Sequence, residues 1–418
     1  MTTSLRFRLL KSQACKFANY MRRHGVKAAL AAVRRQLTSP RSITSLLSKT
    51  DVLTFYRFIL SEPWGEKAQL ESVSTKTLNW IVPPFGFGSG GHLNIFRFIS
   101  QLEARGFVCR IVLVGDSMPS SAEEAKKNIN SWFFPVKASV YLGTEKVPAA
   151  HISVATSWIT AYYLRGFEAT NHKCYFVQDF EPCFYPSGSE YSWAEETYRF
   201  GFYGITAGSW LKNKLNQDYG MHCESFSFSY DAGMYRPTER RDPNVKHVFF
   251  YARPPTARRA FEMGLLVLQR VVLDNPDVRV IFAGWDVSSY EIPFPHLNAG
   301  TVRVDELPDL YSQCDVALVL SFSNLSLLPL ELMACGTPVV SNRGACTEWL
   351  LNENICELAD PTVEALAASV TRLLRDPVRH GALRTAGLDF ANRTHWTNEV
   401  DKVVTIFEKI SLCEVNTL

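Results

Sequence analysis

From residue 78 onward, short apolar runs alternate with longer stretches in which apolar residues recur every three or four positions. The first pattern is typical of buried strands, and the second is typical of helices with one apolar face. Strands that are apolar throughout and separated by helices indicate parallel sheets covered on both faces. The runs that we interpret as strands are Leu78–Pro83, Phe107–Gly115, Ala138–Leu142, His151–Thr156, Lys173–Gln178, Gly204–Ala207, Glu224–Ser229, Val245–Tyr251, Val278–Ala283, Thr301–Val304, Val316–Leu320, Pro338–Ser341 and Ile355–Leu358.

A polar link from Pro237 to Asn244 divides these thirteen runs into seven and six. Thirteen strands are too many for one sheet of this kind, so the pattern predicts two doubly wound α/β domains. A ligand is then expected in the cleft between the C-terminal ends of their strands. The predicted domains are residues 73–236 and 237–395, and residues 396–418 follow them as an amphipathic helix.

Residues 1–72 precede the first predicted domain as a basic helical arm. The first 50 residues hold four lysines, seven arginines and no acidic residue, although the net charge of the whole chain is only +3. Within residues 1–37 the apolar positions recur at helical spacing, interrupted at Gly25. Such a basic amphipathic helix suits an anionic membrane surface, and it also suits a partner protein or the body of this protein. Nucleic acid is not expected as a partner, because no recognition motif accompanies the charge.

The overall composition is that of a globular protein. The 418 residues are 46% hydrophobic and 20% charged, which excludes a disordered or collagen-like chain. No apolar run approaches the ~20 residues of a membrane-spanning helix, which disfavours an integral membrane protein. The ten cysteines are scattered without a C-x-x-C pair. This disfavours a zinc ribbon and fits reduced thiols in the cytoplasm.

A loop with four glycines follows the first predicted strand and ends in Gly90, Gly91 and His92 before a helical pattern begins. Glycines at such a turn let backbone N–H groups approach an anion at the start of the helix. Their spacing matches neither the dinucleotide-binding fingerprint nor the P-loop, so neither class is supported. A ligand-binding loop is the preferred interpretation, and a flexible connection is the alternative.

The second predicted domain opens with a strand followed by Arg253 and Arg258, whereas a surface position is plausible for Arg259. Arginine suits a diphosphate because its guanidinium stays charged and offers paired donors. Further along, a small polar loop at residues 321–326 leads into an apolar helix that carries Glu331. A carboxylate in such a helix needs polar partners such as sugar hydroxyls, or else an exposed position on the far face.

At this point the sequence resembles the glycosyltransferases of family 4, which have the GT-B architecture of two Rossmann-like domains facing a cleft. The resemblance extends over about residues 78–410. Its most specific part is ELMACGTPVV at residues 331–340, which matches the second Glu of the family's paired-Glu pattern and the M-A-x-G-x-P-V-V run after it. The segments Val248–Arg259 and Leu307–Val316 also match.

The resemblance implies roles for individual residues. Arg253 and Arg258 match the basic pair that binds the donor diphosphate, and Glu331 matches the residue that holds the donor ribose. Trp396 matches the aromatic residue that begins the last helix, which in the family crosses back to the N-terminal domain. The donor-side positions expected to bind substrate are Gly284, Tyr311, Ser323, Asn324, Leu325 and Glu331.

Two departures from the family pattern concern the sugar that is transferred. The first Glu of the pair falls on Ser323, and Thr156–Trp158 replace the His often found after the fourth strand. The sugar subsite therefore differs from that of a typical hexosyltransferase. Together with Tyr175–Pro182 and Gly90–Asn94, these features look like the WsaF-like rhamnosyltransferase subgroup, which uses dTDP-β-L-rhamnose. A 6-deoxy sugar is compatible with a less polar subsite.

Asp179 and Glu181 follow a predicted strand of the N-terminal domain and are expected to face the cleft on the acceptor side. Asp179 is a candidate for taking the proton of the acceptor hydroxyl, and His92 is the rival candidate. The alternative for Asp179 is a helix or turn cap. The Asp-Phe-Glu triplet also resembles a metal-binding DxD motif. No metal is expected, because Arg253 and Arg258 already supply positive charge for the leaving diphosphate.

The sequence therefore predicts a metal-independent transferase without a cofactor. It would move a sugar, L-rhamnose from dTDP-β-L-rhamnose, to a glycan or lipid-linked glycan in bacterial surface polysaccharide synthesis. The resemblance implies retention of the anomeric configuration. A sugar-nucleotide epimerase and a catalytically silent sugar-nucleotide-binding protein on the same fold are the alternatives. The expected location is the cytoplasm, with the inner face of the cytoplasmic membrane as an option through residues 1–37. A homodimer is left open.

Overall fold

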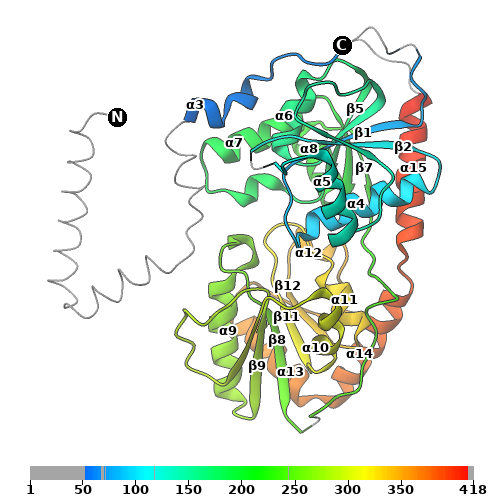
Figure 1. Ribbon diagram of the computed structural model, residues 1–418. Helices are drawn as coiled ribbons and strands as arrows, with labels where there is room; N and C mark the ends of the chain where they lie inside the picture. Colours follow the sequence, from blue (N-terminus) through cyan, green and yellow to red (C-terminus); the bar gives the residue numbers. More distant parts are fainter. Residues whose placement is uncertain (1–51, 67–69, 71, 117, 243, 413–418) are drawn as a thin grey trace, which may run out of the picture. The chain divides into compact units, whose positions relative to one another are not determined.

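The computed structural model describes residues 52–66, 70, 72–116, 118–242 and 244–412 (Figure 1). The chain divides into a first unit, Met1–Arg57, and a second unit, Phe58–Leu418. The described part of the first unit contains the short helix α3, Val52–Phe55, and a 3-10 helix η1, Arg57–Leu60, follows. Residues 1–51, and with them the predicted membrane-binding segment 1–37, lie outside the described residues. Everything below concerns the second unit.

The N-terminal half of the second unit is built on a parallel sheet of seven strands in the order β3-β2-β1-β4-β5-β6-β7. The interior strand β1 is buried at every position, because it lies between neighbours in the sheet and is covered by helices on both faces. The strands are β1 Thr77–Val82, β2 Val108–Leu113, β3 Ser139–Leu142, β4 Ala150–Ala155, β5 Thr170–Val177, β6 Tyr203–Ala207 and β7 Cys223–Phe226. The helices are α4 Gly90–Glu103, α5 Ala122–Trp132, α6 Trp158–Gly166, η3 Glu181–Phe184, α7 Ser189–Glu196, η4 Thr197–Arg199 and α8 Ser209–Tyr219.

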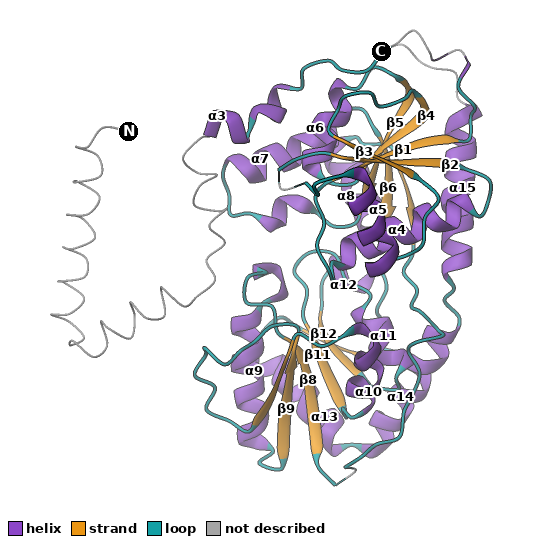
Figure 2. Ribbon diagram, viewed as in Figure 1, coloured by secondary structure: helices purple, strands orange, loops and turns teal. Residues whose placement is uncertain are grey.

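The C-terminal half repeats this arrangement with six parallel strands in the order β10-β9-β8-β11-β12-β13, and Figure 2 shows helices flanking both sheets. The strands are β8 Lys246–Tyr251, β9 Val278–Ala283, β10 His296–Gly300, β11 Val316–Val319, β12 Val339–Asn342 and β13 Glu357–Ala359. The helices are η5 Ala257–Arg259, α9 Phe261–Asp274, η6 Val304–Glu306, α10 Leu307–Ser312, α11 Leu328–Ala334, α12 Ala345–Glu348, α13 Val363–Arg375, α14 Pro377–Asn392 and α15 Trp396–Leu412. The two doubly wound sheets predicted from the sequence are confirmed.

One predicted strand is wrong. Residues 301–304 do not form a strand, because the chain leaves the sheet at Gly300, whose φ is +61°. The strand β10 lies just before it, at His296–Gly300, and among the described strands it pairs with β9 alone. An edge strand needs no continuous apolar run, because one side of it faces solvent. Its sequence HLNAG therefore carries too weak a pattern to be recognised.

The last helix, α15, returns to the N-terminal sheet (red in Figure 1). Phe407 on this helix contacts the buried Trp80 of β1, with ring centroids 6.3 Å apart. Glu399 accepts a hydrogen bond of 2.6 Å from the backbone N–H of Ser227. At the start of the helix, the guanidinium of Arg97 lies 4.5 Å from the ring of Trp396. These contacts tie the end of the chain to the first domain.

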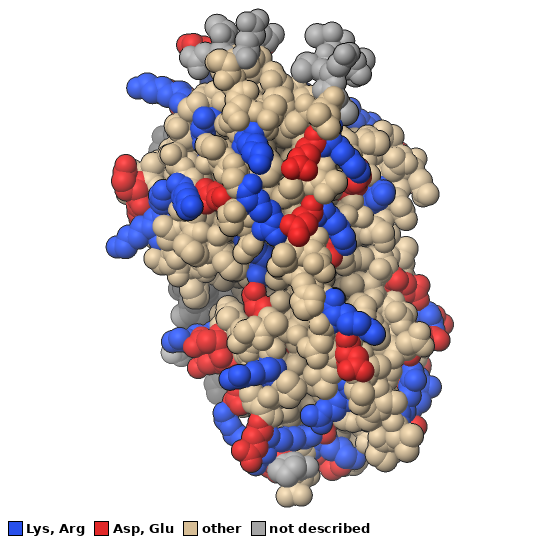
Figure 3. Space-filling view, turned by 90° about the vertical axis from the view of Figure 1, so that its right-hand side faces the viewer, with Lys and Arg blue, Asp and Glu red and all other residues tan. Residues whose placement is uncertain are grey.

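The surface carries both signs of charge. On the face drawn in Figure 3, Lys and Arg side chains are interspersed with Asp and Glu. Some of them pair across elements, as Arg105 does with Asp401 at 2.7 Å. Of the described helices, none combines the length and the apolar character needed to cross a bilayer.

The two halves of the second unit touch directly where β6 ends. Gly208 has a φ of +93°, and a Cβ atom at this position would lie 2.7 Å from the indole ring of Trp349 in the C-terminal half. Trp349 also contacts Phe228, with ring centroids 5.3 Å apart. A glycine is required here both for the backbone conformation and for the approach of the ring.

We expect Gly208→Ala to destabilise the protein more than Gly220→Ala. Both glycines flank α8 and have a positive φ, but a Cβ at Gly220 would meet nothing within 4 Å. Gly220→Ala should therefore cost only the backbone strain, about 1 kcal/mol. Gly208→Ala should cost about 1–3 kcal/mol more, because the added methyl overlaps the indole ring. Urea unfolding followed by tryptophan fluorescence measures both, and equal losses would contradict the packing described here.

Candidate functional site

Three of the candidate loops lie at the C-terminal ends of strands where the order of a sheet reverses. In the N-terminal sheet the order reverses between β1 and β4, and in the C-terminal sheet between β8 and β11. Loops after two such neighbouring strands leave in opposite directions, which opens a crevice where ligands bind in folds of this kind. The glycine loop follows β1, the arginine loop follows β8, and the loop Ser321–Asn324 follows β11.

Arg253 lies in the loop after β8, where it faces the loop after β9. Its guanidinium is 5.9 Å from the ring of Trp285, and one nitrogen is 3.5 Å from the carbonyl oxygen of Gly284. Gly284 has a φ of +104°, and a Cβ there would lie 2.4 Å from the ring of Tyr251. Only glycine allows this close approach of the two loops. Arg253 and Gly284, both predicted as site residues, are thus brought together.

Arg258 and Asp179 meet across the two halves of the unit. The Nε of Arg258 donates to Oδ2 of Asp179 at 3.1 Å. Ser323 donates from its hydroxyl to the same oxygen at 3.1 Å, and the backbone N–H of Asn324 donates to Oδ1 at 2.8 Å. Four residues that the sequence assigned to opposite sides of the cleft therefore form one cluster.

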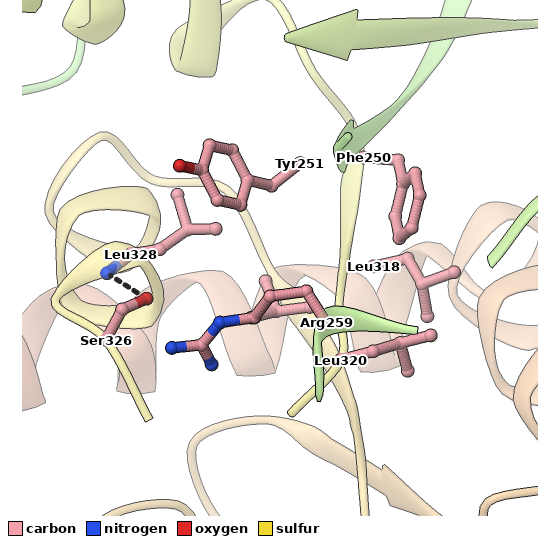
Figure 4. Close-up of a pocket in the computed structure, with 8 residues that line it drawn as sticks. Phe250, Tyr251, Arg259, Leu318, Leu320, Ser326 and Leu328 are labelled. Carbon is pink, nitrogen blue, oxygen red and sulfur yellow. Dashed lines mark hydrogen bonds between the residues drawn. The ribbon is translucent and has the colours of Figure 1, made fainter. Parts of the chain in front are cut away.

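A small pocket lies beside this cluster, at the ends of β8 and β11 (Figure 4). It is lined by Phe250, Tyr251, Arg259, Leu318, Val319, Leu320, Ser326 and Leu328. Arg259 supplies its one charged side chain, and its Nη1 donates to the hydroxyl of Ser321 at 2.5 Å and to the carbonyl oxygen of Asn324 at 3.1 Å. The surface position considered for Arg259 is therefore wrong. The sequence hint was that three arginines, and not two, follow β8.

Glu331 is half-buried in the first turn of α11. Burial raises the pKa of its carboxyl to about 7, against a hydrogen bond from Tyr235 that lowers it. Tyr311 and Leu325, both predicted to bind substrate, are each only 3% exposed and belong to the hydrophobic core. The ring of Tyr311 stacks on Tyr235 with centroids 6.1 Å apart. Neither residue is among those that line the pocket of Figure 4.

On the N-terminal side, the glycine loop is anchored to the end of β5. The Gln178 amide donates to the carbonyl oxygen of Gly91 at 3.0 Å, and a Cβ at Gly90 would meet nothing within 4 Å. The Nδ1 of His92 lies 2.7 Å from the Ser89 hydroxyl. Burial lowers the pKa of His92 to about 4, so the ring is neutral near pH 7. The loop thus presents an open backbone and an uncharged imidazole beside the strand that leads to Asp179.

Two family models match this chain. Residues 88–206 match the family model for the N-terminal domain of WsaF, and residues 246–371 match the model for its C-terminal domain. The chain belongs to the WsaF family. The two matched segments contain residues 88–92 of the glycine loop, Asp179, the three arginines and Glu331.

Within the curated proteins, the WsaF-family chain is 33% identical over 344 residues to the O-antigen biosynthesis protein RfbC of Myxococcus xanthus. The match covers 79% of this chain but only 27% of the relative, so the chain spans about a quarter of that protein's length.

Solved structures show the same architecture at low identity. Sucrose-phosphate synthase from Thermosynechococcus elongatus gives a TM-score of 0.60 at 14% identity, covering 80% of this chain and 98% of that chain. Anabaena Alr3699/HepE in complex with UDP gives 0.60 at 15%, covering 81% and 100%. The WsaF-family chain therefore has the GT-B fold.

Glu181, predicted on the acceptor side, is turned into the N-terminal domain of this WsaF-family protein. Its side chain is 5% exposed, accepts from the backbone N–H of Trp158 at 2.9 Å and accepts from the hydroxyl of Tyr175 at 2.7 Å. The 3-10 helix η3 begins at Glu181, so the chain no longer alternates as a strand would. Glu181 supports the turn beneath Asp179 and does not face the cleft beside it. Burial raises the pKa of Glu181 to about 7.

This buried carboxyl predicts a pH-dependent stability. A native pKa of about 7 against an ordinary 4.5 means that the folded state holds its proton longer than the unfolded state. Stability from this group is complete below pH 4.5 and is lost as the pH rises through 7. The amide in Glu181→Gln keeps the partners but cannot ionise. The variant should therefore gain about 3 kcal/mol relative to wild type between pH ~4.5 and ~8.

Urea unfolding at a series of pH values measures this difference, and the exposed Glu239→Gln serves as the control. A constant offset between Glu181→Gln and wild type across this range would show that Glu181 is not titrating in the folded protein.

Proposed function

We propose that this chain is a glycosyltransferase that moves a sugar from a nucleoside-diphosphate donor to a glycan acceptor, in the synthesis of a bacterial surface polysaccharide. The observation that carries the proposal is the gathering of Arg253, Arg258 and Arg259 after β8, where the order of the C-terminal sheet reverses. A diphosphate leaving group needs positive charge there, and arginine provides it with paired donors. The relationship to the O-antigen biosynthesis protein RfbC supports the polysaccharide context.

The donor is held by the C-terminal domain and the acceptor by the N-terminal domain in this proposal. UDP in the complex of the fold neighbour HepE supports a nucleotide donor. The proposed sugar is L-rhamnose from dTDP-β-L-rhamnose, the donor that the resemblance to the WsaF-like rhamnosyltransferase subgroup implies. Attack on the same face as the departing diphosphate, with retention, is the mechanism that the family resemblance implies.

The residues of the site divide the chemical work. The arginines stabilise the charge that develops on the departing diphosphate, which lowers the barrier without a metal. The neutral His92 is the candidate for receiving the acceptor proton, because the carboxylate of Asp179 already accepts four hydrogen bonds. Contact between the two halves of the unit shields the reacting carbon from water, which limits hydrolysis of the donor.

Nucleotide binding tests this proposal. Calorimetric titration with dTDP, UDP, GDP and ADP, without added metal, should show binding that is selective for dTDP. Arg253→Ala and Glu331→Ala should each weaken that binding by about 1–3 kcal/mol, the loss expected for a charged hydrogen bond. Arg270→Ala, which removes an exposed arginine of α9 paired with Asp274, is the control and should bind like wild type.

Binding of UDP or GDP in place of dTDP would move the donor to another sugar and keep the transferase. Failure to bind any of the four nucleotides would overturn the donor site. Unchanged affinity in both variants would overturn the assignment of Arg253 and Glu331.

We further propose that residues 1–37 hold the enzyme at an anionic membrane, where lipid-linked acceptors reside. Each basic residue near such a surface contributes about 1 kcal/mol of attraction. Deleting residues 1–37 should therefore reduce sedimentation with phosphatidylserine vesicles while leaving nucleotide affinity intact. Equal sedimentation with and without these residues would refute the membrane role.

A further inference from the structure

The carboxylate of Asp179 accepts four hydrogen bonds where the two halves of the unit meet. It is 8% exposed and lies two residues after the end of β5 in the N-terminal sheet. One oxygen accepts from the backbone N–H groups of Phe180 and Asn324, both at 2.8 Å. The other accepts from Arg258 and from the hydroxyl of Ser323, both at 3.1 Å. Three of these four donors belong to the C-terminal half.

Asn324 returns the connection in the opposite direction. Its side-chain amide donates to the carbonyl oxygen of Gln178 at 2.9 Å and to that of Ala207 at 2.7 Å. These carbonyls lie at the ends of β5 and β6. The loop Ser321–Asn324 is therefore bonded to two neighbouring strands of the facing sheet, in addition to Asp179.

The same loop is also hydrogen-bonded to the arginine loop after β8. Arg259, which lines the pocket, donates to the carbonyl oxygen of Asn324 at 3.1 Å, and the backbone N–H of Phe322 donates to the carbonyl oxygen of Arg258 at 2.9 Å. The Arg258 guanidinium also lies 4.0 Å from the ring of Phe184 in the N-terminal half. A movement of Asp179 would consequently shift the hydrogen-bond partners of both Arg258 and Arg259.

Energetics make Asp179 the partner that this loop depends on. Removing the carboxylate takes a hydrogen-bond acceptor away from the Ser323 hydroxyl, the Asn324 N–H and the Arg258 side chain. These donors lie in a poorly solvated space. Leaving buried donors unpaired is costly, and the cost is higher when one of them is charged.

We propose that Asp179 is a positioning residue through which the N-terminal domain shapes the donor loop Ser321–Asn324 and orients Arg258. The loop Ser321–Asn324 and Arg258 then take up their positions when the two domains come into contact. The proposal also accounts for the carboxylate that lies beside Ser323, although residue 323 itself is not acidic. We call the hydrogen bonds between Asp179 and the C-terminal half the clasp. The proposal rests on the proposed function only for its catalytic consequence, since the clasp is a property of the free protein.

Relocating the carboxylate tests the proposal. The variants are Asp179→Ser, Ser323→Asp and the double variant, which exchanges the acid and the hydroxyl across the same gap. Amide hydrogen exchange is followed by mass spectrometry on peptides that contain residues 321–327. Asp218→Ser removes an exposed carboxylate paired with Lys214 and is the control.

Each single variant should exchange about tenfold faster in residues 321–327, because Asp179→Ser removes the acceptor and Ser323→Asp opposes two carboxylates. The double variant should return close to wild type, since coupled neighbours are not additive. Peptides from β1 and β8 should keep their protection in every variant, which shows that the sheets remain folded. Unchanged exchange in Asp179→Ser, or a double variant as fast as both singles combined, would overturn the proposal.

Nucleotide titration of the same three variants and the control separates this inference from the proposed function. Where wild type binds dTDP or UDP, the affinity should fall about tenfold in each single variant and recover in the double variant. An affinity that stays at the wild-type value in the single variants would overturn the orientation of Arg258 by Asp179. A wild-type protein that binds no nucleotide, together with the expected exchange pattern, would refute the proposed function and support the clasp.

Discussion

The reversal of strand order in each parallel sheet is the constraint on which the site depends. The reversal between β1 and β4 sends the glycine loop one way and the turn before α6 the other, and β8 and β11 do the same in the second sheet. Backbone groups at these strand ends are not used up by the sheet. They are therefore available to ligands or to the facing domain. The facing domain uses the next strand ends of the N-terminal sheet, because the Asn324 amide donates to the carbonyls of Gln178 after β5 and of Ala207 in β6.

Burial then decides what each charged group can do. Arg253 and Arg258 stay partly accessible, and their contacts are long or shared, so a diphosphate can compete for them. Glu181 lies only two residues from Asp179 but is bonded to Trp158 and Tyr175 inside the domain, which leaves it a structural role. His92 is kept neutral by its surroundings. Burial thus separates charged side chains that a ligand could reach from charged side chains with a structural role.

Much of the fold was readable from the sequence, because strands buried on both faces must be apolar throughout. The exception, β10, is an edge strand with the polar sequence HLNAG, which lacks that requirement. Within the site, the sequence could supply residue types but not directions. Arg258 and Arg259 are adjacent, and a 3-10 turn followed by Ala260 at a φ of +48° points one to Asp179 and the other into the pocket. The spacing of apolar residues does not predict such a turn. For this reason the surface position considered for Arg259 was wrong.

The pairing of Ser323 with Asp179 gives the departure from the family pattern a physical reason. The Ser323 hydroxyl lies 3.1 Å from a carboxylate that already accepts from Arg258 and from the Asn324 N–H. A glutamate at position 323 would bring a second negative charge to this poorly solvated point, and two carboxylates so close do not both ionise readily. A hydroxyl, in contrast, donates to Asp179 and adds no charge. The acid on one domain and the serine on the other are therefore best understood as a matched pair, in which neither residue type is explained without the other.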